Sequence, residues 1–322
     1  MASLSLTAYS NTLSGFGATT TFNIIGGSGS YNVVVESGTN VISATQSDGN
    51  PREIMVKALT VGEGVVKVVD LKTNEVQRFN VTVKASAAPR SETITVNGVS
   101  FDMVAVEGGT FMMGAADGDT EADGDERPRH YVTLGGFSIG KTEVTQALWE
   151  AVMGSNPSSF NGANRPVESV SWNDCQEFIK KLNGLTGRTF RLPTEAEWEF
   201  AARGGNLGKG CKYAGSDDLD AVAWYDGNSG GQTHDVATKS PNELGLYDMS
   251  GNVWEWCQDW YGGYPSEAQT DPQGPDTGSY RVNRGGGWNY IARYCRVSHR
   301  YCLNPDYRDQ SYGLRLALQV LP

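Results

Sequence analysis

The stretch RLPTEAEWEFAARGG, Arg191–Gly205, carries the signals for the start, body and end of one helix. Thr194 and Glu197 have the T-x-x-E spacing of a capping box, in which each side chain satisfies a backbone N–H at the helix start. The double glycine that follows predicts the helix end. The apolar residues expected on its buried face are Ala196, Phe200 and Ala201. The stretch therefore predicts a short helix with one face turned to a core.

Two further short helices are expected upstream. The first is TEVTQALWEAVM, Thr142–Met153, which Gly154 ends. Its expected core face is Val144, Leu148, Ala151 and Val152. The second begins at Ser171, and Cys175 on it is interpreted as a core residue rather than a nucleophile. The residues it is expected to bury are Phe178, Ile179 and Leu182. Short helices among 40 glycines and eight tryptophans predict an irregular α+β domain.

The overall composition limits the partners that the chain can have. A length of 322 residues predicts two domains. The net charge of −11 argues against a nucleic-acid backbone or an anionic membrane surface as partner. No apolar run is long enough to span a bilayer, and the start MASLSLTAYSNT lacks the regions of a signal peptide. The five cysteines include no CxxC pair, which excludes zinc-ribbon and thioredoxin motifs and leaves their pairing open.

Residues 1–84 contain neither tryptophan nor cysteine. Alternating runs such as YNVVVES and GVVKVVDL, separated by glycine and polar residues, predict the short strands of an all-β sandwich. The pattern G-x-G-x-Y-N-V-V-V and the final QRFNVTV resemble the bacterial Ig-like domains that serve as stalks in surface and phage-tail proteins. The small residues and proline of KASAAPRSE then favour a linker at 85–92. A second domain is expected over 93–322.

The second part of the chain has motifs that are specific in combination. They are EVTQALWEAVMG, RPVESVSWNDCQEFIKKLN, RLPTEAEWEFAARGG, NELGLYDMSGNVWEWCQDWY, RVNRGGGWN and NPDYRDQSYGLRLAL. Together they resemble the formylglycine-generating-enzyme (sulfatase-modifying factor) family over nearly all of residues 100–320. The resemblance implies a C-type-lectin-like fold with little regular secondary structure. That family includes cysteine oxidases, iron enzymes of ergothioneine synthesis, and the variable proteins of diversity-generating retroelements, which are ligand-binding receptors.

The metal positions of the enzymes argue against catalysis here. The oxidases bind copper through two cysteines in a C-x4-C arrangement, and the resemblance places the second at Cys295 and the first at Tyr290. A phenol does not replace a thiolate as a ligand of Cu(I). The iron enzymes need a cluster of histidines, and the chain has three in all. No copper, no iron and no enzymatic activity are therefore expected.

A structural calcium site is implied by LYDMSGNVWEW. In the family two side-chain oxygens and two backbone carbonyls hold the ion, and such hard oxygen donors suit Ca²⁺. The positions implied are Asp248, Gly251, Val253 and Glu255. The alternative is that Asn252 and Glu255 only hydrogen-bond a tight turn. The six acidic residues within 117–126 lack EF-hand spacing and are expected to form a solvated loop.

The segment Asn289–Gly313 differs in composition from the rest of the chain. It holds five of the 14 tyrosines and no Lys or Glu. In retroelement variable proteins the template codon AAC recurs, and changes at its first two bases yield every residue type in this segment except that of Gln310. Tyrosine gives large, stiff contact area, while Asn, Ser and Asp give adaptable hydrogen bonds, as in antibody loops. The composition predicts a variable ligand-binding segment at 285–315.

The candidate binding residues are Asn289, Tyr290, Ile291, Arg293, Tyr294, His299, Tyr301, Cys302, Leu303, Asn304, Tyr307, Asp309, Ser311 and Tyr312. Scaffold roles, including bidentate arginine contacts between loops, are expected of Trp288, Arg296, Arg300, Arg308, Arg315 and Gly285–Gly287. The predicted function is a non-catalytic receptor or adhesin for a protein or glycan on a target cell. The Ig-like stalk would display it on a virion (a phage tail) or at an extracellular bacterial surface. A cysteine oxidase and a lectin-like module of fixed specificity are the alternatives.

Overall fold

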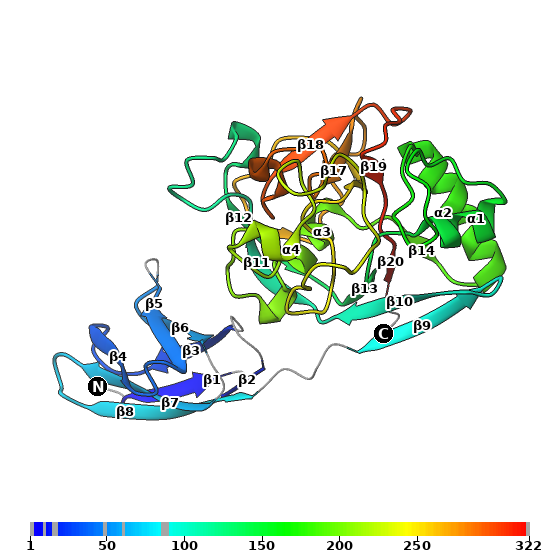
Figure 1. Ribbon diagram of the computed structural model, residues 1–322. Helices are drawn as coiled ribbons and strands as arrows, with labels where there is room; N and C mark the ends of the chain where they lie inside the picture. Colours follow the sequence, from blue (N-terminus) through cyan, green and yellow to red (C-terminus); the bar gives the residue numbers. More distant parts are fainter. Residues whose placement is uncertain are drawn as a thin grey trace. The chain divides into compact units, whose positions relative to one another are not determined.

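The computed structural model describes residues 3–8, 11–14, 19–47, 50–59, 62–84 and 90–319. The chain forms two compact units, Met1–Ala87 and Ala88–Pro322 (Figure 1). In the described residues no helix is both long and apolar enough to cross a membrane. Five of the eight residues of the predicted linker lie outside the described part, and Ser91 and Glu92 belong to a strand instead.

The first unit is an all-β sandwich. One sheet has the order β1-β3-β6-β5 and the other the order β2-β8-β7-β4. The strands are β1 Ser5–Ala8, β2 Thr12–Ser14, β3 Thr19–Ile25, β4 Tyr31–Ser37, β5 Ile42–Gln46, β6 Glu53–Ala58, β7 Gly62–Asp70 and β8 Val76–Lys84. Alternate residues of both sheets, among them Phe22, Val56 and Val68, meet in one apolar core. The predicted sandwich of alternating strands is present; its assignment to the Ig-like class stays a prediction.

The second unit is built on a sheet that brings its two ends together. The sheet has the order β14-β20-β13-β10-β9. The last strand of the unit, β20, therefore pairs with β13 on one side and with β14 on the other. The strands are β9 Ser91–Val96, β10 Val99–Val106, β13 Phe137–Gly140, β14 Phe190–Arg191 and β20 Ala317–Gln319. Helices α1 (Gln146–Met153) and α2 (Trp172–Thr186) pack on one another, and α1 also contacts the β9–β10 hairpin (Figure 1).

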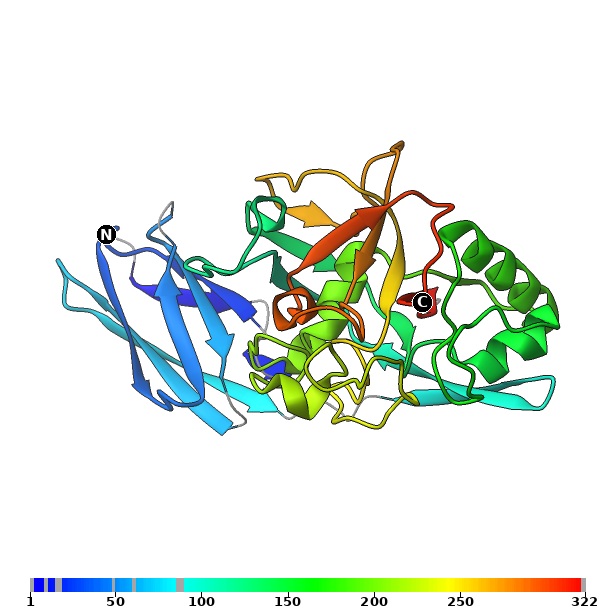
Figure 2. The ribbon, with the colours of Figure 1, turned by 45° about the horizontal axis from the view of Figure 1, so that its top comes forward.

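A second sheet of the unit carries the C-terminal segment. Its order is β18-β17-β15-β19, with β15 Trp254–Trp260, β17 Arg281–Arg284, β18 Arg300–Leu303 and β19 Tyr312–Gly313. Strands β15, β17 and β18 lie side by side in Figure 2. A third, small sheet has the order β11-β12-β16, from Gly109–Met113, His130–Leu134 and Gln269–Thr270. Much of the remaining chain is turn and loop, as an irregular α+β domain predicts.

The helices differ from the expectation mainly at one boundary. Helix α1 begins at Gln146 rather than Thr142, because the Thr145 side chain accepts a hydrogen bond from the Leu148 N–H and caps the helix there. Trp149, which was not expected in the core, is buried and stacks on Phe178 of α2 at 4.8 Å between ring centroids. Helix α2 begins after Ser171 as predicted, and its Cys175 is buried in the core.

Helix α3, Glu195–Ala202, has the predicted capping box between Thr194 and Glu197, and it ends before the two glycines. It is buried on every side, however, and not on one face. Its three glutamates are buried, and each of them is paired with at least one arginine. The pairs are Glu195 with Arg300, Glu197 with Arg191, and Glu199 with Arg203 and Arg284. A buried carboxylate is tolerated only when it is paired in this way.

Candidate functional site

The candidate site is a cluster of aromatic rings around Trp254, the first residue of β15. Trp254 is fully buried. The ring centroids of Tyr290 and Tyr301 lie 5.3 and 5.6 Å from its own. Tyr294 lies 6.4 Å away, and Tyr307 reaches the cluster through Tyr312 at 5.6 Å. We call the four tyrosines Tyr290, Tyr294, Tyr301 and Tyr307 the aromatic patch; their rings come from three separate parts of the C-terminal segment.

The predicted binding residues fall into three groups by exposure. The exposed ones are Asn289, Ile291, Tyr301, Asn304 and Tyr307, with Tyr301 and Tyr307 each 42% exposed. The half-buried ones are Tyr290, Arg293, Tyr294, Cys302, Leu303 and Asp309. The buried ones are His299, Ser311 and Tyr312. A ligand would touch the first two groups directly, while the third group lies beneath the surface that they form.

Some half-buried members of the set also have partners within the protein. Arg293 donates to both carboxylate oxygens of Asp123, at 2.5 and 2.6 Å. Asp309 accepts from the backbone and the hydroxyl of Ser311. The hydroxyls of Tyr290 and Tyr312 lie 3.1 Å apart. These contacts fix the side chains that border the aromatic patch.

The main chain of this segment is held by groups outside the predicted binding set. Arg284, fully buried on β17, donates to the carbonyl oxygens of Val297, Ser298 and His299. Ser250 and Trp288 donate in the same way to the carbonyls of Cys295 and Gln310. Further carbonyls, those of Tyr290, Pro305, Asp309 and Ser311, accept from backbone N–H groups of Asp226, Asn173, Ser169 and Trp254. Such bonds do not depend on which side chains the segment carries.

The arginines predicted to be scaffold make the bidentate contacts expected of them. Arg296 binds Glu126, Arg300 binds Glu195, Arg308 binds Asp174, and Arg315 binds Glu255. Only the Arg308 pair is exposed. Sequence reasoning missed Arg284, because nothing in RVNRGGGWN marks which of its two arginines is buried.

The two positions of the family's copper ligands are occupied by a phenol and a buried thiol. Tyr290 is half-buried and packs edge-on against Trp254. Cys295 is fully buried in an apolar cluster with Leu219 and Val222. Burial raises the pKa of the Cys295 thiol to about 12, so the thiolate that a metal would need is disfavoured at neutral pH. The pair therefore offers no fit to Cu(I).

The residues implied for calcium lie in a buried acidic region, but one of them is already engaged. The Glu255 carboxylate accepts from Arg315 and from the indole N–H of Trp198. Asp248 has one oxygen bonded to the Ala237 N–H, while its Oδ1 has no partner among the described residues. Glu143 lies close enough to both carboxylates to interact with them electrostatically, and Arg315 is the cation beside them. Burial raises the pKa of Glu143 and Asp248, so both gain by meeting a cation there. Three buried carboxylates beside one guanidinium are a donor set that fits a cation, and calcium there stays a prediction.

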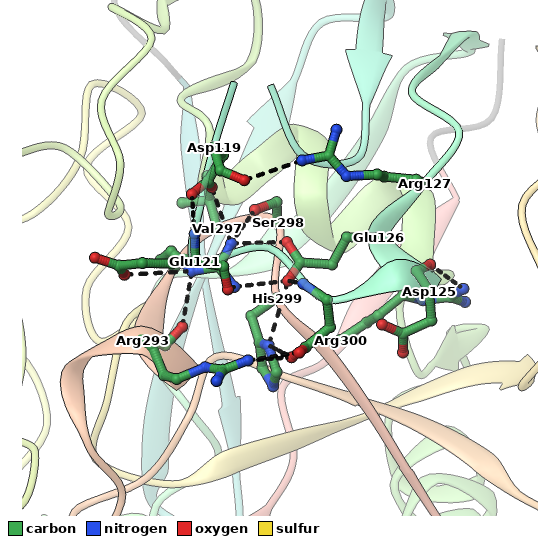
Figure 3. Close-up of polar contacts among 12 residues, drawn as sticks. Asp119, Glu121, Asp125, Glu126, Arg127, Arg293, Val297, Ser298, His299 and Arg300 are labelled. Atoms are coloured by element: carbon green, nitrogen blue, oxygen red, sulfur yellow. Dashed lines mark hydrogen bonds and ion pairs between the residues drawn. The ribbon is translucent and has the colours of Figure 1, made fainter. Parts of the chain in front are cut away.

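The acidic stretch 117–126 is only in part the solvated loop that its composition suggests, because Asp117 and Glu121 are exposed whereas its end is buried. Glu126 is fully buried, and Asp119 and Asp123 pair with Arg296 and Arg293. Burial works to raise the pKa of Glu126, but the neighbouring His299 ring and the Arg296 guanidinium hold it below its usual value. Figure 3 shows the acidic side chains converging on the segment that ends with Arg300. Composition failed here because it does not show that distant arginines reach these carboxylates.

Comparison with known proteins places the chain in a protein family. Residues 89–320 match the family described as the sulfatase-modifying factor enzyme 1-like domain, and the chain belongs to this family. The formylglycine-generating enzyme of Thermomonospora curvata is 31% identical, over 68% of this chain and 94% of that protein. The chaperone protein LppX of Paenibacillus barcinonensis is 34% identical, over 68% of this chain and 89% of that protein.

Among solved structures, the chain is similar to Treponema denticola variable protein 1. The two share 36% identity with a TM-score of 0.67, covering 72% of this chain and 100% of the other. PvdO from Pseudomonas aeruginosa is 26% identical with a TM-score of 0.61, over 73% of this chain and 100% of the other. The predicted resemblance to the family, and to a variable protein within it, is confirmed.

Proposed function

We propose that this protein is a non-catalytic ligand-binding receptor whose aromatic patch is the contact surface. The surface is diversified by a retroelement, and the residues that vary are the exposed and half-buried members of 289–312. The ligand is a protein or glycan on a target cell. The first unit acts as an Ig-like stalk that displays the site on a phage tail or at a bacterial cell surface.

The observation that carries this proposal is a difference between the backbone and the side chains of segment 289–312. Its carbonyls are held by Arg284, Ser250 and Trp288, while Tyr301, Tyr307 and other side chains face outward. A loop held through its backbone tolerates changes of outward side chains such as Tyr301 and Tyr307, since the hydrogen bonds that hold the backbone do not involve them. Exposed tyrosines are otherwise costly, because they leave apolar ring surface in water. Similarity to Treponema denticola variable protein 1 agrees with a binding role.

The first experiment is deep sequencing of codons 281–322 in a growing population of the source organism, with codons 100–280 as the internal control. The expected result is substitution confined to the positions named above, each reachable from an AAC codon. Uniform sequence in both windows would contradict diversification and favour a receptor of fixed specificity.

The binding role itself is tested on purified protein. A triple variant Tyr294→Ala, Tyr301→Ala, Tyr307→Ala is expected to keep its melting temperature within a few degrees, because two of the three rings are widely exposed. Glycan-array binding and binding to intact candidate host cells are expected to fall at least tenfold, as for loss of clustered tyrosine anchors. Undiminished binding by a folded triple variant would refute the aromatic patch as the contact surface.

One alternative has a specific observation in its favour, since formylglycine-generating enzymes are among the relatives. Incubation with copper and a cysteine-containing sulfatase peptide tests it by mass spectrometry. No formylglycine is expected, because Tyr290 stands where the first cysteine would be and Cys295 is buried. The formylglycine-generating enzyme of Thermomonospora curvata, assayed in parallel, controls for the assay, and product from the unaltered chain would overturn the non-catalytic assignment.

A further inference from the structure

A single group of metal-ligating side chains stands out among the described residues outside the positions discussed for copper and calcium: Asp123, Glu126 and His299. One ligand atom from each lies within 4.8 Å of the others. Asp123 and Glu126 lie in the acidic loop before β12, and His299 lies directly before β18. The fold brings these two distant stretches together, as Glu126 and His299 show in Figure 3.

His299 is the unusual member of this group. Its side chain is only 2% exposed, yet neither ring nitrogen has a hydrogen-bond partner among the described residues. An imidazole buried without a partner loses its bonds to water and gains nothing in return, which destabilises the fold unless a ligand completes the site. Its Nδ1 points at the two carboxylates, 3.7 Å from Asp123 Oδ2 and 3.6 Å from Glu126 Oε1. These distances are too long for hydrogen bonds.

The same distances suit a shared metal ion. Zinc binds histidine nitrogen and carboxylate oxygen at about 2.0–2.2 Å, so two ligands on a tetrahedral ion lie roughly 3.4 Å apart. The separations of 3.6 and 3.7 Å thus need little rearrangement. Asp123 is about half-exposed, with 45% of its side chain accessible, which leaves the site a path to solvent.

Neighbouring cations hold the carboxylates of the group in place. Asp119, Asp123 and Glu126 pair with Arg296 and Arg293, Glu121 pairs with Lys212, and Arg127 donates to the backbone carbonyl of Asp119. Arg296 approaches Glu126 and Arg293 approaches Asp123, so each carboxylate is held in place by a guanidinium. Arginines that orient ligating carboxylates are typical partners behind a metal site.

We propose that Asp123, Glu126 and His299 form a binding site for a divalent transition-metal ion, with Zn²⁺ the best match. One imidazole nitrogen with two carboxylates suits zinc better than calcium, which prefers oxygen ligands alone. The ion ties the acidic loop to the segment beneath Tyr294, whose ring lies 4.8 Å from that of His299. The proposal does not depend on the identity of the ligand that the aromatic patch binds.

The experiment measures zinc binding by calorimetry at pH 7.5, using the full chain without an affinity tag and after treatment with EDTA. Cys211 and Cys302 are only partly buried, and accessible thiols are zinc ligands, so both are replaced by serine throughout. About one equivalent of zinc is expected, with a rise in melting temperature. Asp123→Asn and His299→Gln are each expected to weaken binding at least tenfold, while His234→Gln, a half-buried histidine stacked on Trp224, leaves it unchanged.

Cobalt substitution separates the ligand types, because a nitrogen and oxygen site gives visible bands without the near-ultraviolet charge-transfer band of thiolates. Asp123→Asn keeps the test informative if His299→Gln does not fold, since Asp123 lies at the surface. Absence of zinc binding, or equal binding by the Asp123→Asn protein, would overturn the proposal. Calcium binding that survives Asp123→Asn would belong to the Asp248 region instead and would not support it.

Discussion

At the scale of single residues, Asp259 shows how burial changes the chemistry of one side chain. It is 4% exposed on β15 and accepts a hydrogen bond from the Glu195 N–H. Burial, reinforced by the nearby Glu195 carboxylate, raises the pKa of Asp259 to about 8. At neutral pH the folded protein therefore holds a proton there that the unfolded chain, with a pKa of about 3.9, has released.

This proton makes stability depend on pH with a definite sign. Between about pH 4 and pH 8 the folded state binds more protons at Asp259, so its contribution to stability falls as the pH rises, by up to about 1.4 kcal/mol per unit. Asp259→Asn stays neutral and avoids this loss. Its free energy of unfolding is expected to exceed that of the unaltered protein by more at pH 8 than at pH 5, measured by urea denaturation.

Asp102 gives a matched control of opposite sign. A hydrogen bond from Thr93, together with Lys141, lowers the pKa of Asp102, so its charged form is favoured in the folded protein. Asp102→Asn is expected to lose stability above pH 4, where Asp259→Asn gains it. If the free energy of unfolding of Asp259→Asn instead changed with pH in the same way as that of the unaltered protein, Asp259 would be ionised in the folded protein.

The calcium prediction also belongs to single residues. Asp248 Oδ1 has no partner among the described residues, whereas Glu255 is shared with Arg315 and Trp198. Chelation by EGTA, followed by CaCl2, is expected to lower and then restore the melting temperature of the second unit. Asp248→Ala should remove this response, and Asp123→Asn should retain it. A melting temperature unaffected by EGTA would mean that Asn252 and Glu143 simply brace a tight turn, as their hydrogen bond allows.

At the scale of elements, β17 holds the C-terminal segment through Arg284. Its guanidinium binds Glu199 and the carbonyls of Val297, Ser298 and His299, and it is fully buried. Arg284→Met keeps much of the volume but leaves three carbonyls without this donor and removes one of the two guanidinium partners of the buried Glu199 carboxylate. A loss of about 3–5 kcal/mol in the free energy of unfolding is expected, together with weaker ligand binding.

The exposed pair of Arg308 and Asp174 supplies the comparison. The same change, Arg308→Met, removes a bidentate ion pair at the surface, 2.6 and 2.7 Å long. Because water screens such pairs, the expected loss is only about 0–1 kcal/mol. Similar losses in the free energy of unfolding for Arg284→Met and Arg308→Met would mean that the buried contacts of Arg284 do not hold the C-terminal segment in place. Urea denaturation of the two proteins side by side measures this.

Sequence reasoning succeeded at this scale where the signal is local. Capping residues such as Ser171 and Thr194 fix where helices begin, because they bond to groups three residues away. It failed where the cause is distant. Glu195, Glu199 and Glu126 pair with Arg300, Arg284 and Arg296, which lie 85–170 residues away, and no local pattern encodes that pairing. For the same reason the sequence predicted a surface at 289–312 but not that His299, Ser311 and Tyr312 lie beneath it.

At the scale of the whole molecule, the sequence separates two units by composition alone. The first has no tryptophan, and the second has all eight. The structure divides the chain at Ala87, close to the predicted boundary at 84. The difference arises because the small residues around 84–92 do not show where strand pairing resumes, whereas β9 begins at Ser91.

The two units are expected to fold independently, because each has its own apolar core. Among the described residues, the core of the first draws on residues up to Val83, and the cores of the second on residues from Ile94 onward. A protein of residues 88–322 should therefore melt within about 2 °C of the corresponding transition of the full chain, and bind zinc and ligand equally well. Differential scanning calorimetry of the full chain should resolve two transitions, and residues 1–87 alone should reproduce the other one. A single transition that is lost when either unit is removed would show instead that the first unit stabilises the second, and that binding variants must be compared in the full chain.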